Sequence, residues 1–411
     1  MTEKIDTVIV GGGQGGLSTS YFLSQQGREH IILEQTLQAA KAWRERWDSF
    51  TFNTPNWMTQ LPGVEYEGNE PDGFLARDEI IRYFEEYIKR NKLPVRYGIQ
   101  VKAIMKTADG YLVETDKTDY MAANVVVATG LFQHPKDLPF RKDLSAEIVQ
   151  LHSSEYRNPG ALPEGAVLVV GSAQSGCQIA EELYQNGRKV YMALGNAGRF
   201  PRRYRGMEAT RWLDKIGFFD KTPDMLPSSK ARFAGSPHLT GKDGGHTINL
   251  HQFARDGVTL LGHIKNARGY RITLVPDLKD CLAKGDQFEA EMVRQIDDYI
   301  NRQGLDVPLE TLPELRNGYE SEEILELDLQ EAGISSIVWA TGFSFDFSLV
   351  KLPIFDEFGF PVQKRGVTEY PGLYFVGIPF LYSFKSGILY GVGEDAAYVA
   401  KHISSRVLQT N

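Results

Sequence analysis

The sequence predicts an α/β fold with two parallel sheets, and three observations lead to this prediction. A short β-branched run is followed by a glycine-rich turn and a helix, which is the β-α-β arrangement of a buried strand and its crossover helix. The same pattern returns 160 residues later, from Gly11 to Gly171. Two further buried strands each end in Ala-Thr-Gly, at 128–130 and 340–342. Together these features predict two Rossmann-like dinucleotide-binding domains.

The first motif begins with the apolar run 7–10, which is too short for a helix and suits a strand buried on both faces. Residues 17–25 favour a helix whose N-terminus would present backbone N–H groups to a phosphate. The next strand, 31–33, ends in Glu34, where an adenosine ribose needs an acceptor for its hydroxyl groups. The turn itself has the G-x-G-x-x-G spacing, with Gly11, Gly13 and Gly16. This stretch predicts a dinucleotide site.

The second motif follows the run 167–170, with Ala173 in place of the middle glycine. The position that matches Glu34 is Leu194, so the ribose carboxylate is missing from this site. Arginines follow instead, and a guanidinium group near the ribose favours the 2′-phosphate of NADP over NAD. These arginines are Arg199, Arg202, Arg203 and Arg205. The alternative is that they form a solvated face or an ion-pair patch between domains.

The composition excludes several classes of protein. The chain has 411 residues and a net charge of −8, which predicts about two domains and disfavours binding to nucleic acid or anionic membranes. It has no apolar stretch of bilayer-spanning length and no signal-peptide pattern, so a cytoplasmic location is expected. The two cysteines, Cys177 and Cys281, do not form a C-x-x-C redox pair. His246 and His251 lack a third ligand at a suitable spacing, so no metal is expected there.

The rest of the chain indicates how the two domains are connected. The segment 95–118 has the short alternating strands of a β-meander, and 78–92 has the apolar stripe of an amphipathic helix. A buried strand at 373–377 and a helix from Gly391 to about residue 405 are expected to complete the sheet that begins at Thr7. The predicted domains are a first part at 1–160, an inserted domain at 161–330 and a completing part at 331–411.

The sequence resembles the class B flavin-dependent monooxygenases, in particular the compact flavin-containing monooxygenases that include the plant auxin-forming type. Two glycine motifs, two Ala-Thr-Gly turns and the absence of a redox cysteine pair carry this resemblance. The H-x-x-x-Y half of the family fingerprint is present at 152–156. Its first half is absent, because Ala146 and Ile148 occupy the phenylalanine and glycine positions.

The resemblance implies FAD at the first site and NADPH at the second, with the NADP domain inserted in the FAD domain. The expected FAD-binding residues are Gly11, Gly13, Gln14, Gly16, Glu34, Gln35, Arg44, Trp47, Thr129 and Gly130. The expected NADPH-binding residues are Gly171, Ser172, Gln174, Ser175, Gly176, Arg199, Arg202 and Arg203, with Ala340, Thr341 and Gly342 as further cofactor-binding residues. For the loop that carries Arg44 and Trp47, a surface loop with buried tryptophans is the alternative.

The resemblance also implies a mechanism, in which NADPH reduces FAD and a flavin 4a-hydroperoxide oxygenates a small organic substrate. Nitrogen or sulfur is the expected target, and dioxygen is the co-substrate. Asn53 falls where the heteroatom-oxidising members carry an active-site asparagine, although a turn or cap asparagine is an equal reading of the local sequence. The alternatives are a flavin-dependent NAD(P)H oxidase or reductase, a Baeyer–Villiger-type monooxygenase, and a non-catalytic dinucleotide-binding protein. The sequence leaves the oligomeric state open, and a homodimer is compatible with it.

Overall fold

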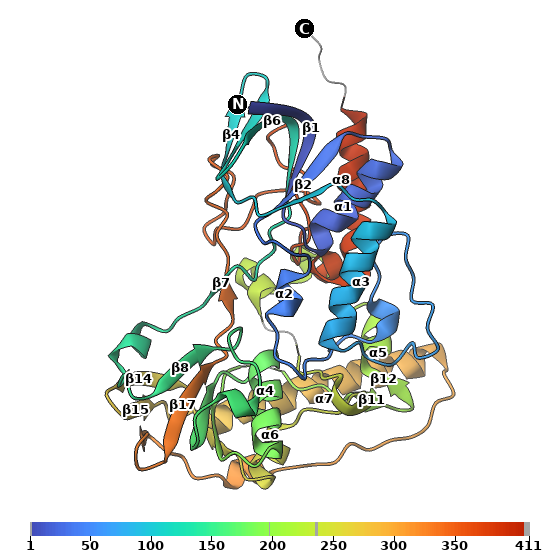
Figure 1. Cartoon of the computed structure of the whole chain (residues 1–411). Helices are drawn as coiled ribbons and strands as arrows, with labels where there is room; N and C mark the ends of the chain where they lie inside the picture. The colour runs from blue at the N-terminus through green and yellow to red at the C-terminus, as the bar shows by residue number, and fades with distance from the viewer. Residues whose placement is uncertain (1, 197, 235–236, 407–411) are drawn as a thin grey trace.

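The computed structural model describes residues 2–196, 198–234 and 237–406, and its two main sheets lie one above the other in Figure 1. The first sheet has seven strands in the order β3-β2-β1-β6-β5-β4, with β19 paired to β6. The α/β fold predicted from the sequence is confirmed. The strands of this sheet are β1 Thr2–Val10, β2 His30–Glu34, β3 Val95–Tyr97, β4 Val101–Thr107, β5 Gly110–Thr115, β6 Asp119–Val127 and β19 Leu373–Phe375.

The second sheet has five strands in the order β13-β10-β9-β17-β8, all of them parallel. Its strands are β8 Val149–His152, β9 Ala166–Val170, β10 Val190–Ala193, β13 Thr259–Leu261 and β17 Ile334–Trp339. Smaller ribbons are formed by β11 Arg203–Tyr204 with β12 Met207–Glu208, and by β14 Ile264–Arg268, β15 Arg271–Leu274 and β16 Glu326–Asp328.

The helices include the two that open the glycine motifs, α1 and α4. Their bounds are α1 Gln14–Gln25, α2 Lys41–Arg44, α3 Arg77–Arg90, α4 Gln174–Gln185, α5 Ala209–Lys215, α6 Leu250–Arg255, α7 Leu278–Gln303 and α8 Leu389–Ser405. Helix α7 is long, and its buried face includes Leu278, Leu282 and Ile296. None of the helices in the described ranges is long and apolar enough to cross a membrane.

The C-terminal segment completes the first sheet, as the sequence predicts. Strand β19 pairs in parallel with β6, with Leu373 opposite Val125. Helix α8 packs against α1, and both lie on the same side of this sheet in Figure 1. Strands β4, β5 and β6 form the predicted antiparallel meander.

The sheet pairing differs from the expected domain boundaries at two strands. Strand β8 lies before residue 160 and β17 lies after residue 330, yet both belong to the second sheet, where β17 pairs with β8 and β9. The sequence around β17 and β6 is alike, since both are buried apolar strands that end in Ala-Thr-Gly. Such a pattern predicts a buried strand and does not say which sheet it joins.

The chain passes twice between the two sheets, and the two passages pair with each other. Strand β7, His134–Pro135, carries the chain toward the second sheet, and β18, Phe343–Ser344, carries it back. They form a two-stranded antiparallel ribbon in which Phe343 lies opposite Pro135. The second sheet is therefore an insertion whose two ends meet at this ribbon.

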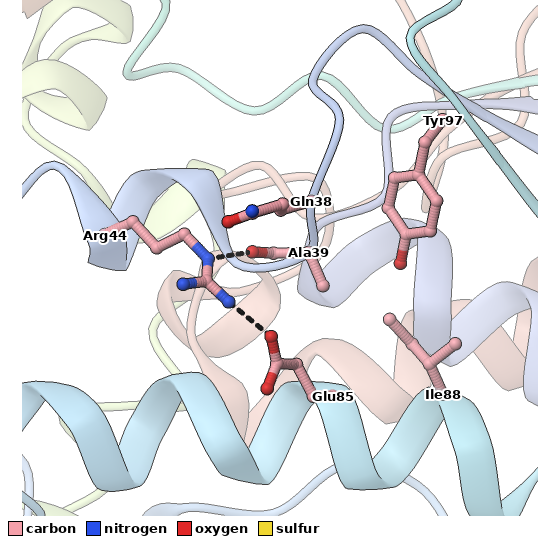
Figure 2. A pocket seen from close by; sticks show the side chains of 6 residues that line it. All are labelled: Gln38, Ala39, Arg44, Glu85, Ile88 and Tyr97. Carbon is pink, nitrogen blue, oxygen red and sulfur yellow. Dashed lines mark hydrogen bonds and ion pairs between the residues drawn. The ribbon is translucent and has the colours of Figure 1, made fainter.

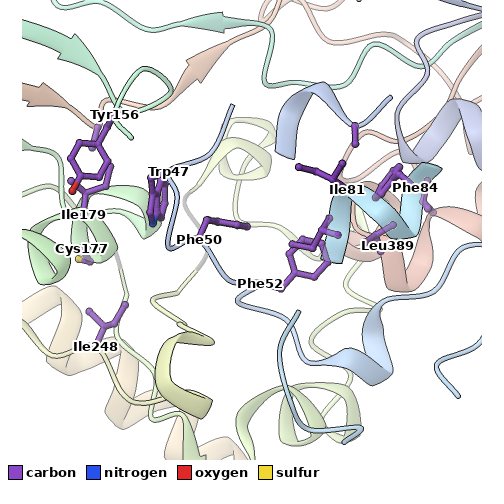
Figure 3. Close-up of a cluster of buried hydrophobic side chains, with 14 of the residues drawn as sticks. Trp47, Phe50, Phe52, Ile81, Phe84, Tyr156, Cys177, Ile179, Ile248 and Leu389 are labelled. Atoms are coloured by element: carbon purple, nitrogen blue, oxygen red, sulfur yellow. The ribbon is translucent and has the colours of Figure 1, made fainter. Parts of the chain in front are cut away.

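A continuous apolar cluster joins the two parts of the molecule (Figure 3). Phe52, Ile81 and Leu389 contribute from the elements around the first sheet, and Tyr156 and Ile179 from those around the second. Burial of large side chains of this kind stabilises a fold by about 1.5–3 kcal/mol each. The contact between the two sheets is therefore part of the hydrophobic core.

Candidate functional site

The first glycine turn runs from the end of β1 into α1. Gly11 has a φ of +108°, and a Cβ there would lie 2.6 Å from the carbonyl oxygen of Ala128, so only glycine fits. A Cβ on Gly16 would overlap the carbonyl oxygen of Gly11. These two glycines are thus required by the close packing of turn, helix and β6.

Gly13, at the tip of the turn, is required by neither backbone nor packing. Its φ of −83° and ψ of −171° suit any residue, it is exposed, and a Cβ would meet no described atom within 4 Å. The space in front of Gly13 is where the first-turn N–H groups of α1 point, which is the arrangement that binds a phosphate.

The C-terminal segment completes this site, which the glycine pattern alone did not reveal. The side-chain amide of Gln14 donates to the carbonyl of Gly387 at 2.6 Å, and a Cβ on Gly15 would lie 2.9 Å from the carbonyl oxygen of Val376. The side chain of Gln14 is therefore used within the protein, and only its backbone N–H remains for a phosphate. The sequence did indicate part of this contact, because Val376 and Gly377 end the buried strand predicted near the C-terminus.

Glu34 lies beside the turn at the end of β2. Its Oε2 accepts from the backbone N–H of Gly12 at 2.8 Å, and its Oε1 accepts from both the N–H and the hydroxyl of Thr36. A carboxylate accepts about four hydrogen bonds, so one position on Oε2 is left for a ligand hydroxyl. The half-buried Glu34 therefore fixes the turn and keeps one acceptor position free of the hydrogen bonds to Gly12 and Thr36.

A cavity of about 440 Å³ opens between the loop after β2, α3 and β3 (Figure 2). Tyr97 lines it from β3, where it lies opposite Glu34 in the sheet. Arg44 donates to the carbonyl of Ala39 at 2.9 Å and forms an ion pair with Glu85 of α3, and both contacts are drawn in Figure 2. Gln35 is exposed nearby, and the remaining lining residues are Gln38, Ala39 and Ile88.

Trp47 does not have the surface that a cofactor contact needs. Its side chain is 3% exposed, and its ring packs edge-on to Phe50 with the ring centroids 5.1 Å apart. Figure 3 shows it beside Tyr156 and Ile179. This packing disfavours the expected FAD contact of Trp47 and favours the alternative, a loop with buried tryptophans, and the FAD contact stays a prediction.

The second glycine turn repeats the geometry of the first. Gly171 has a φ of +105°, and a Cβ there would lie 2.5 Å from the carbonyl oxygen of Ala340. A Cβ on Gly176 would overlap the carbonyl oxygen of Gly171. Ala173 has the φ and ψ of Gly13 within a few degrees and is likewise exposed. Each Ala-Thr-Gly segment thus packs under one glycine turn, with 128–130 under the first and 340–342 under the second.

The polar side chains of the second turn are engaged within the protein. The Ser172 hydroxyl is buried and accepts from the N–H of Gly195 at 2.8 Å. Gln174 holds the backbone of Leu239 with both its amide nitrogen and its oxygen, as Gln14 holds Gly387. Ser175, in the first turn of α4, is half-buried. What remains for a ligand is the backbone of the turn and the first turn of α4.

The neighbouring His238 was not singled out by sequence reasoning. It is buried, its Nε2 contacts the carbonyl of Ser172, and burial lowers its pKa to about 4. The imidazole is therefore neutral at pH 7 and donates from Nε2. No motif surrounds His238 in the sequence, so no signal could have placed it at this turn.

The three arginines expected to read a 2′-phosphate have other partners. Arg199 forms ion pairs with Asp286 and Glu289 of α7, each at 2.6 Å. Arg203 donates to the backbone carbonyls of Gly244 and Gly245. Arg202 is buried and forms an ion pair with Glu208, as described below. Carboxylates thus neutralise Arg199 and Arg202, which disfavours a role for them in phosphate binding, and their assignment to the 2′-phosphate stays a prediction.

A different cation lies beside the end of β10. Lys284 of α7 is exposed, and its Nζ is 2.8 Å from Oδ1 of Asn196. Asn196 is two residues beyond Leu194, the position that matches Glu34. Because Lys284 is 90 residues away in the sequence from Leu194, only the fold reveals this proximity.

Asn53 lies where the loop after β2 meets the inserted segment. Its side chain is half-buried and makes no hydrogen bond to the described residues, while its carbonyl accepts from Nη1 of Arg202 at 2.7 Å. Gly241 packs directly on the neighbouring carbonyl of Phe52. The amide of Asn53 is thus available, and its backbone is held from the inserted side.

Arg202 connects the loop that carries Asn53 to the inserted segment. Its guanidinium lies 2.7 Å from Oε1 of Glu208 and stacks over Phe74 at 4.3 Å, and the side chains of the ion pair are each 2% exposed. Burial lowers the pKa of Arg202 to about 10, which still leaves it charged at pH 7. A buried charge of this kind depends on its partner.

The fingerprint H-x-x-x-Y anchors the passages between the sheets. The His152 ring is buried and its Nε2 is 3.0 Å from the carbonyl of Gly342, just before β18, and this burial lowers the pKa of His152. The Tyr156 hydroxyl donates to Glu182 of α4 at 2.7 Å. Thr129 and Gly130 are tied to the other passage, because Gln133 donates to both. Thr341 donates to Lys136, so these turns also connect the sheets.

Comparisons with known proteins agree with this architecture. Residues 8–207 match the family model described as pyridine nucleotide-disulphide oxidoreductase. An uncharacterized CzcO-like oxidoreductase of Geobacillus kaustophilus is 31% identical over 98% of this chain and 99% of its own. Indole-3-pyruvate monooxygenase YUCCA1 of Oryza sativa is 26% identical over 96% of this chain and 90% of its own.

Among solved structures, the flavin-containing monooxygenase from Stenotrophomonas maltophilia superposes with a TM-score of 0.67 at 18% identity, covering 98% of this chain and 99% of that one. At this identity the match shows the fold, which is the fold expected from the resemblance. The full-length similarity to the Geobacillus relative adds the family. The chain is therefore an oxidoreductase and belongs to the family of CzcO-like oxidoreductases.

Proposed function

We propose that this oxidoreductase is an NADPH- and FAD-dependent monooxygenase that oxygenates a small organic substrate at nitrogen or sulfur. The observation that carries the proposal is the pair of glycine turns with the same backbone geometry, each seated on its own Ala-Thr-Gly segment. Two such turns predict two dinucleotides, one to receive hydride and one to deliver it.

The residues at the first turn fit FAD. Gly13 leaves open space at the N-terminus of α1 for the pyrophosphate, and Glu34 keeps an acceptor position for the ribose. Tyr97 lies opposite Glu34 in the sheet, and the cavity that Tyr97 and Arg44 line is large enough for an adenine ring. In this assignment Gln35 lies at its rim, and Thr129 and Gly130 lie behind the turn.

The residues at the second turn fit NADPH. Ala173 presents an exposed turn tip to a pyrophosphate, and Leu194 offers no carboxylate to repel a 2′-phosphate. We assign recognition of that phosphate to Lys284, whose exposed ammonium lies beside Asn196. An ammonium–phosphate hydrogen bond contributes about 1.5–3 kcal/mol, enough for a preference over NADH.

When bound, the cofactors would supply hydride transfer and the activation of dioxygen, and the protein's part is to orient and to exclude water. Asn53 would donate its side-chain amide to the oxygen that reacts, and Arg202 would hold the Asn53 backbone from behind. The aromatic side chains Trp43, Phe50 and Phe52, whose rings contact one another, would keep water from this junction.

The names of the relatives support oxygenation. The rice relative is a monooxygenase, and the Stenotrophomonas structure is a flavin-containing monooxygenase. The family model names disulphide reductases, but the two cysteines of this chain are both buried and do not form a disulfide. We therefore rank the NAD(P)H oxidase or reductase second, with Baeyer–Villiger insertion as a variant of the first proposal.

Partners and location follow from this proposal. Dioxygen and a small amine or sulfide would be the substrates, a homodimer the assembly, and the NADPH-containing cytoplasm the place of action. Static light scattering and cell fractionation test the last two directly.

Rapid mixing tests the proposed function. The purified holoenzyme is reduced with NADPH without oxygen and mixed with aerated buffer while the flavin absorbance is recorded. Without a substrate we expect slow return of the oxidised spectrum with release of hydrogen peroxide. With an amine or sulfide present, the return should be faster, with oxygenated product and water formed in place of most of the hydrogen peroxide. Immediate reoxidation with one equivalent of peroxide under all conditions would establish the oxidase or reductase instead. Failure of NADPH to reduce the flavin would refute the cofactor assignment.

A matched pair of variants tests the role of Asn53. Asn53→Ala removes only the amide, and we expect more peroxide and less oxygenated product at unchanged NADPH reduction. Gln60→Ala removes an amide from the same loop region, where it bonds to the carbonyl of Trp57, and should leave the ratio unchanged. Equal peroxide from both variants would remove Asn53 from the mechanism.

A further inference from the structure

Three side chains with metal-binding donors meet at the start of α7. His263 lies between β13 and β14, Asp277 precedes α7, and Cys281 follows one helical turn later, with its N–H bonded to the carbonyl of Asp277. Their donor atoms all lie within 4.8 Å of one another. None of the three belongs to the two dinucleotide turns.

The way these groups face each other is unusual for a hydrogen-bonded cluster. Asp277 Oδ2 is 2.8 Å and Cys281 Sγ is 3.5 Å from the same ring nitrogen, Nδ1 of His263. A ring nitrogen carries either a proton for the carboxylate or a lone pair for the thiol, so it serves one partner only. In a nucleophilic triad the acid and the thiol would use opposite ring nitrogens. A carboxylate, a thiol and an imidazole whose donor atoms lie this close together match the ligand needs of a cation.

The separations fit a tetrahedral ion of the size of zinc. With Zn–S near 2.3 Å and Zn–N or Zn–O near 2.0–2.1 Å, tetrahedral angles place N and S about 3.6 Å apart and N and O about 3.3 Å apart. The N–S distance of 3.5 Å already agrees, and the N–O distance of 2.8 Å must open by about half an ångström. The other carboxylate oxygen, Oδ1, accepts from the backbone N–H of His263 and so fixes the carboxylate relative to the histidine.

The burial of the ligands also fits. Cys281 is 2% exposed, whereas the side chains of His263 and Asp277 are 37% and 24% exposed, so the metal has a path of entry and room for water as a fourth ligand. A thiolate with an imidazole selects zinc over magnesium or calcium, which prefer oxygen ligands only.

We propose that His263, Asp277 and Cys281 bind one Zn²⁺, which ties the loop between β13 and β14 to the start of α7. Helix α7 carries Asp286 and Glu289, the partners of Arg199, and Lys284. The metal thus fixes the start of the helix that contacts the segment after β10, through Arg199 and Asn196. The inference is independent of the proposed oxygenase activity, since it depends only on these three residues and their distances.

Metal binding by the intact holoenzyme tests the proposal. The protein is treated with chelator, and Zn²⁺ is added in competition with a chromophoric indicator. We expect one equivalent to bind. Co²⁺ is then added, and a thiolate–cobalt charge-transfer band with tetrahedral d–d bands at wavelengths beyond the flavin absorbance is expected.

Three variants separate this site from other metal binding. Cys281→Ser should abolish the charge-transfer band, and His263→Gln should weaken Zn²⁺ binding more than about 100-fold, because outer-shell partners alone contribute about 10–100-fold. Cys177→Ser removes the other buried thiol and should change neither. Far-UV circular dichroism shows which variants are folded, and Zn²⁺ should raise the Tm of the wild type and of Cys177→Ser but not of Cys281→Ser. Absence of stoichiometric binding, or a charge-transfer band that persists in Cys281→Ser, would overturn the proposal.

Discussion

The buried ion pair between Arg202 and Glu208 allows a decisive test of what Arg202 does. Both side chains are 2% exposed, so Arg202→Met leaves the Glu208 carboxylate buried without its partner. Breaking a buried pair in this way costs about 3–5 kcal/mol of folding free energy. The variant also leaves the Asn53 carbonyl without its donor.

The magnitude is best obtained from a double-mutant cycle. Arg202→Met and Glu208→Gln should each destabilise the protein, but the double variant should cost about 2–3 kcal/mol less than the sum, because the second change removes the unpaired charge left by the first. Arg203→Met is the matched control, since this neighbour is exposed and bonds only to backbone carbonyls. Its cost should stay below about 1 kcal/mol. Chemical denaturation of the holoenzymes, followed by circular dichroism, measures all four variants.

The same variants test whether Arg202 forms an internal ion pair or binds the 2′-phosphate of NADPH. With Arg202 inside the protein, Arg202→Met should change the KM values for NADPH and NADH by the same factor. A rise of about 10–100-fold in the KM for NADPH alone, the size expected for one lost charged hydrogen bond, would refute the assignment. Additive free energies in the cycle would refute the ion pair itself.

Three further outcomes are expected. Lys284→Gln should raise the KM for NADPH about tenfold or more and leave the KM for NADH unchanged. The control is Lys279→Gln, which changes an exposed lysine of the same helix. Equal effects on the two KM values would exclude a 2′-phosphate contact. In Glu34→Gln the new NH2 group faces either the N–H of Gly12 or that of Thr36, so one of these two hydrogen bonds loses its acceptor. FAD binding, measured by flavin fluorescence, should therefore be about 10–100-fold weaker. Because burial lowers the pKa of His238 to about 4 from near 6.5, the unfolded chain binds more protons across this window, and stability falls as the pH drops through it. The free energy of unfolding should therefore fall between pH 7 and pH 5 by about 2 kcal/mol less in His238→Gln than in the wild type. An equal fall in both proteins would mean that His238 is not the titrating group.

The sequence was sufficient for features that depend on local pattern. The β-branched run before Gly11 and its copy before Gly171 predict buried strands, because few other conformations bury a short apolar run. Gly11 and Gly16 are recognisable because the packing of the turn excludes any side chain. The completion of the first sheet by residues 373–375 also followed, since an unpaired buried strand near the C-terminus must join a sheet.

What could not be predicted depends on contacts between distant residues. The arginines after β10 have the composition of a phosphate site, and only the fold shows that Asp286, Glu289 and Glu208 neutralise two of them. Trp47 has the residue type of a flavin contact, but whether an aromatic ring faces a ligand or the core is decided by packing. The meeting of Lys284 with Asn196 is invisible in the sequence for the same reason.

The ribbon formed by β7 and β18 has a consequence for how this protein could be rebuilt. Because Pro135 lies opposite Phe343, the segment between them leaves the first sheet and returns to it at the same place. A segment whose two ends are adjacent is a cassette: it could be exchanged with that of a relative, with only two junctions to be rejoined. The surrounding sheet would keep its strand order, since β6 and β19 pair with each other on their own side of the junctions.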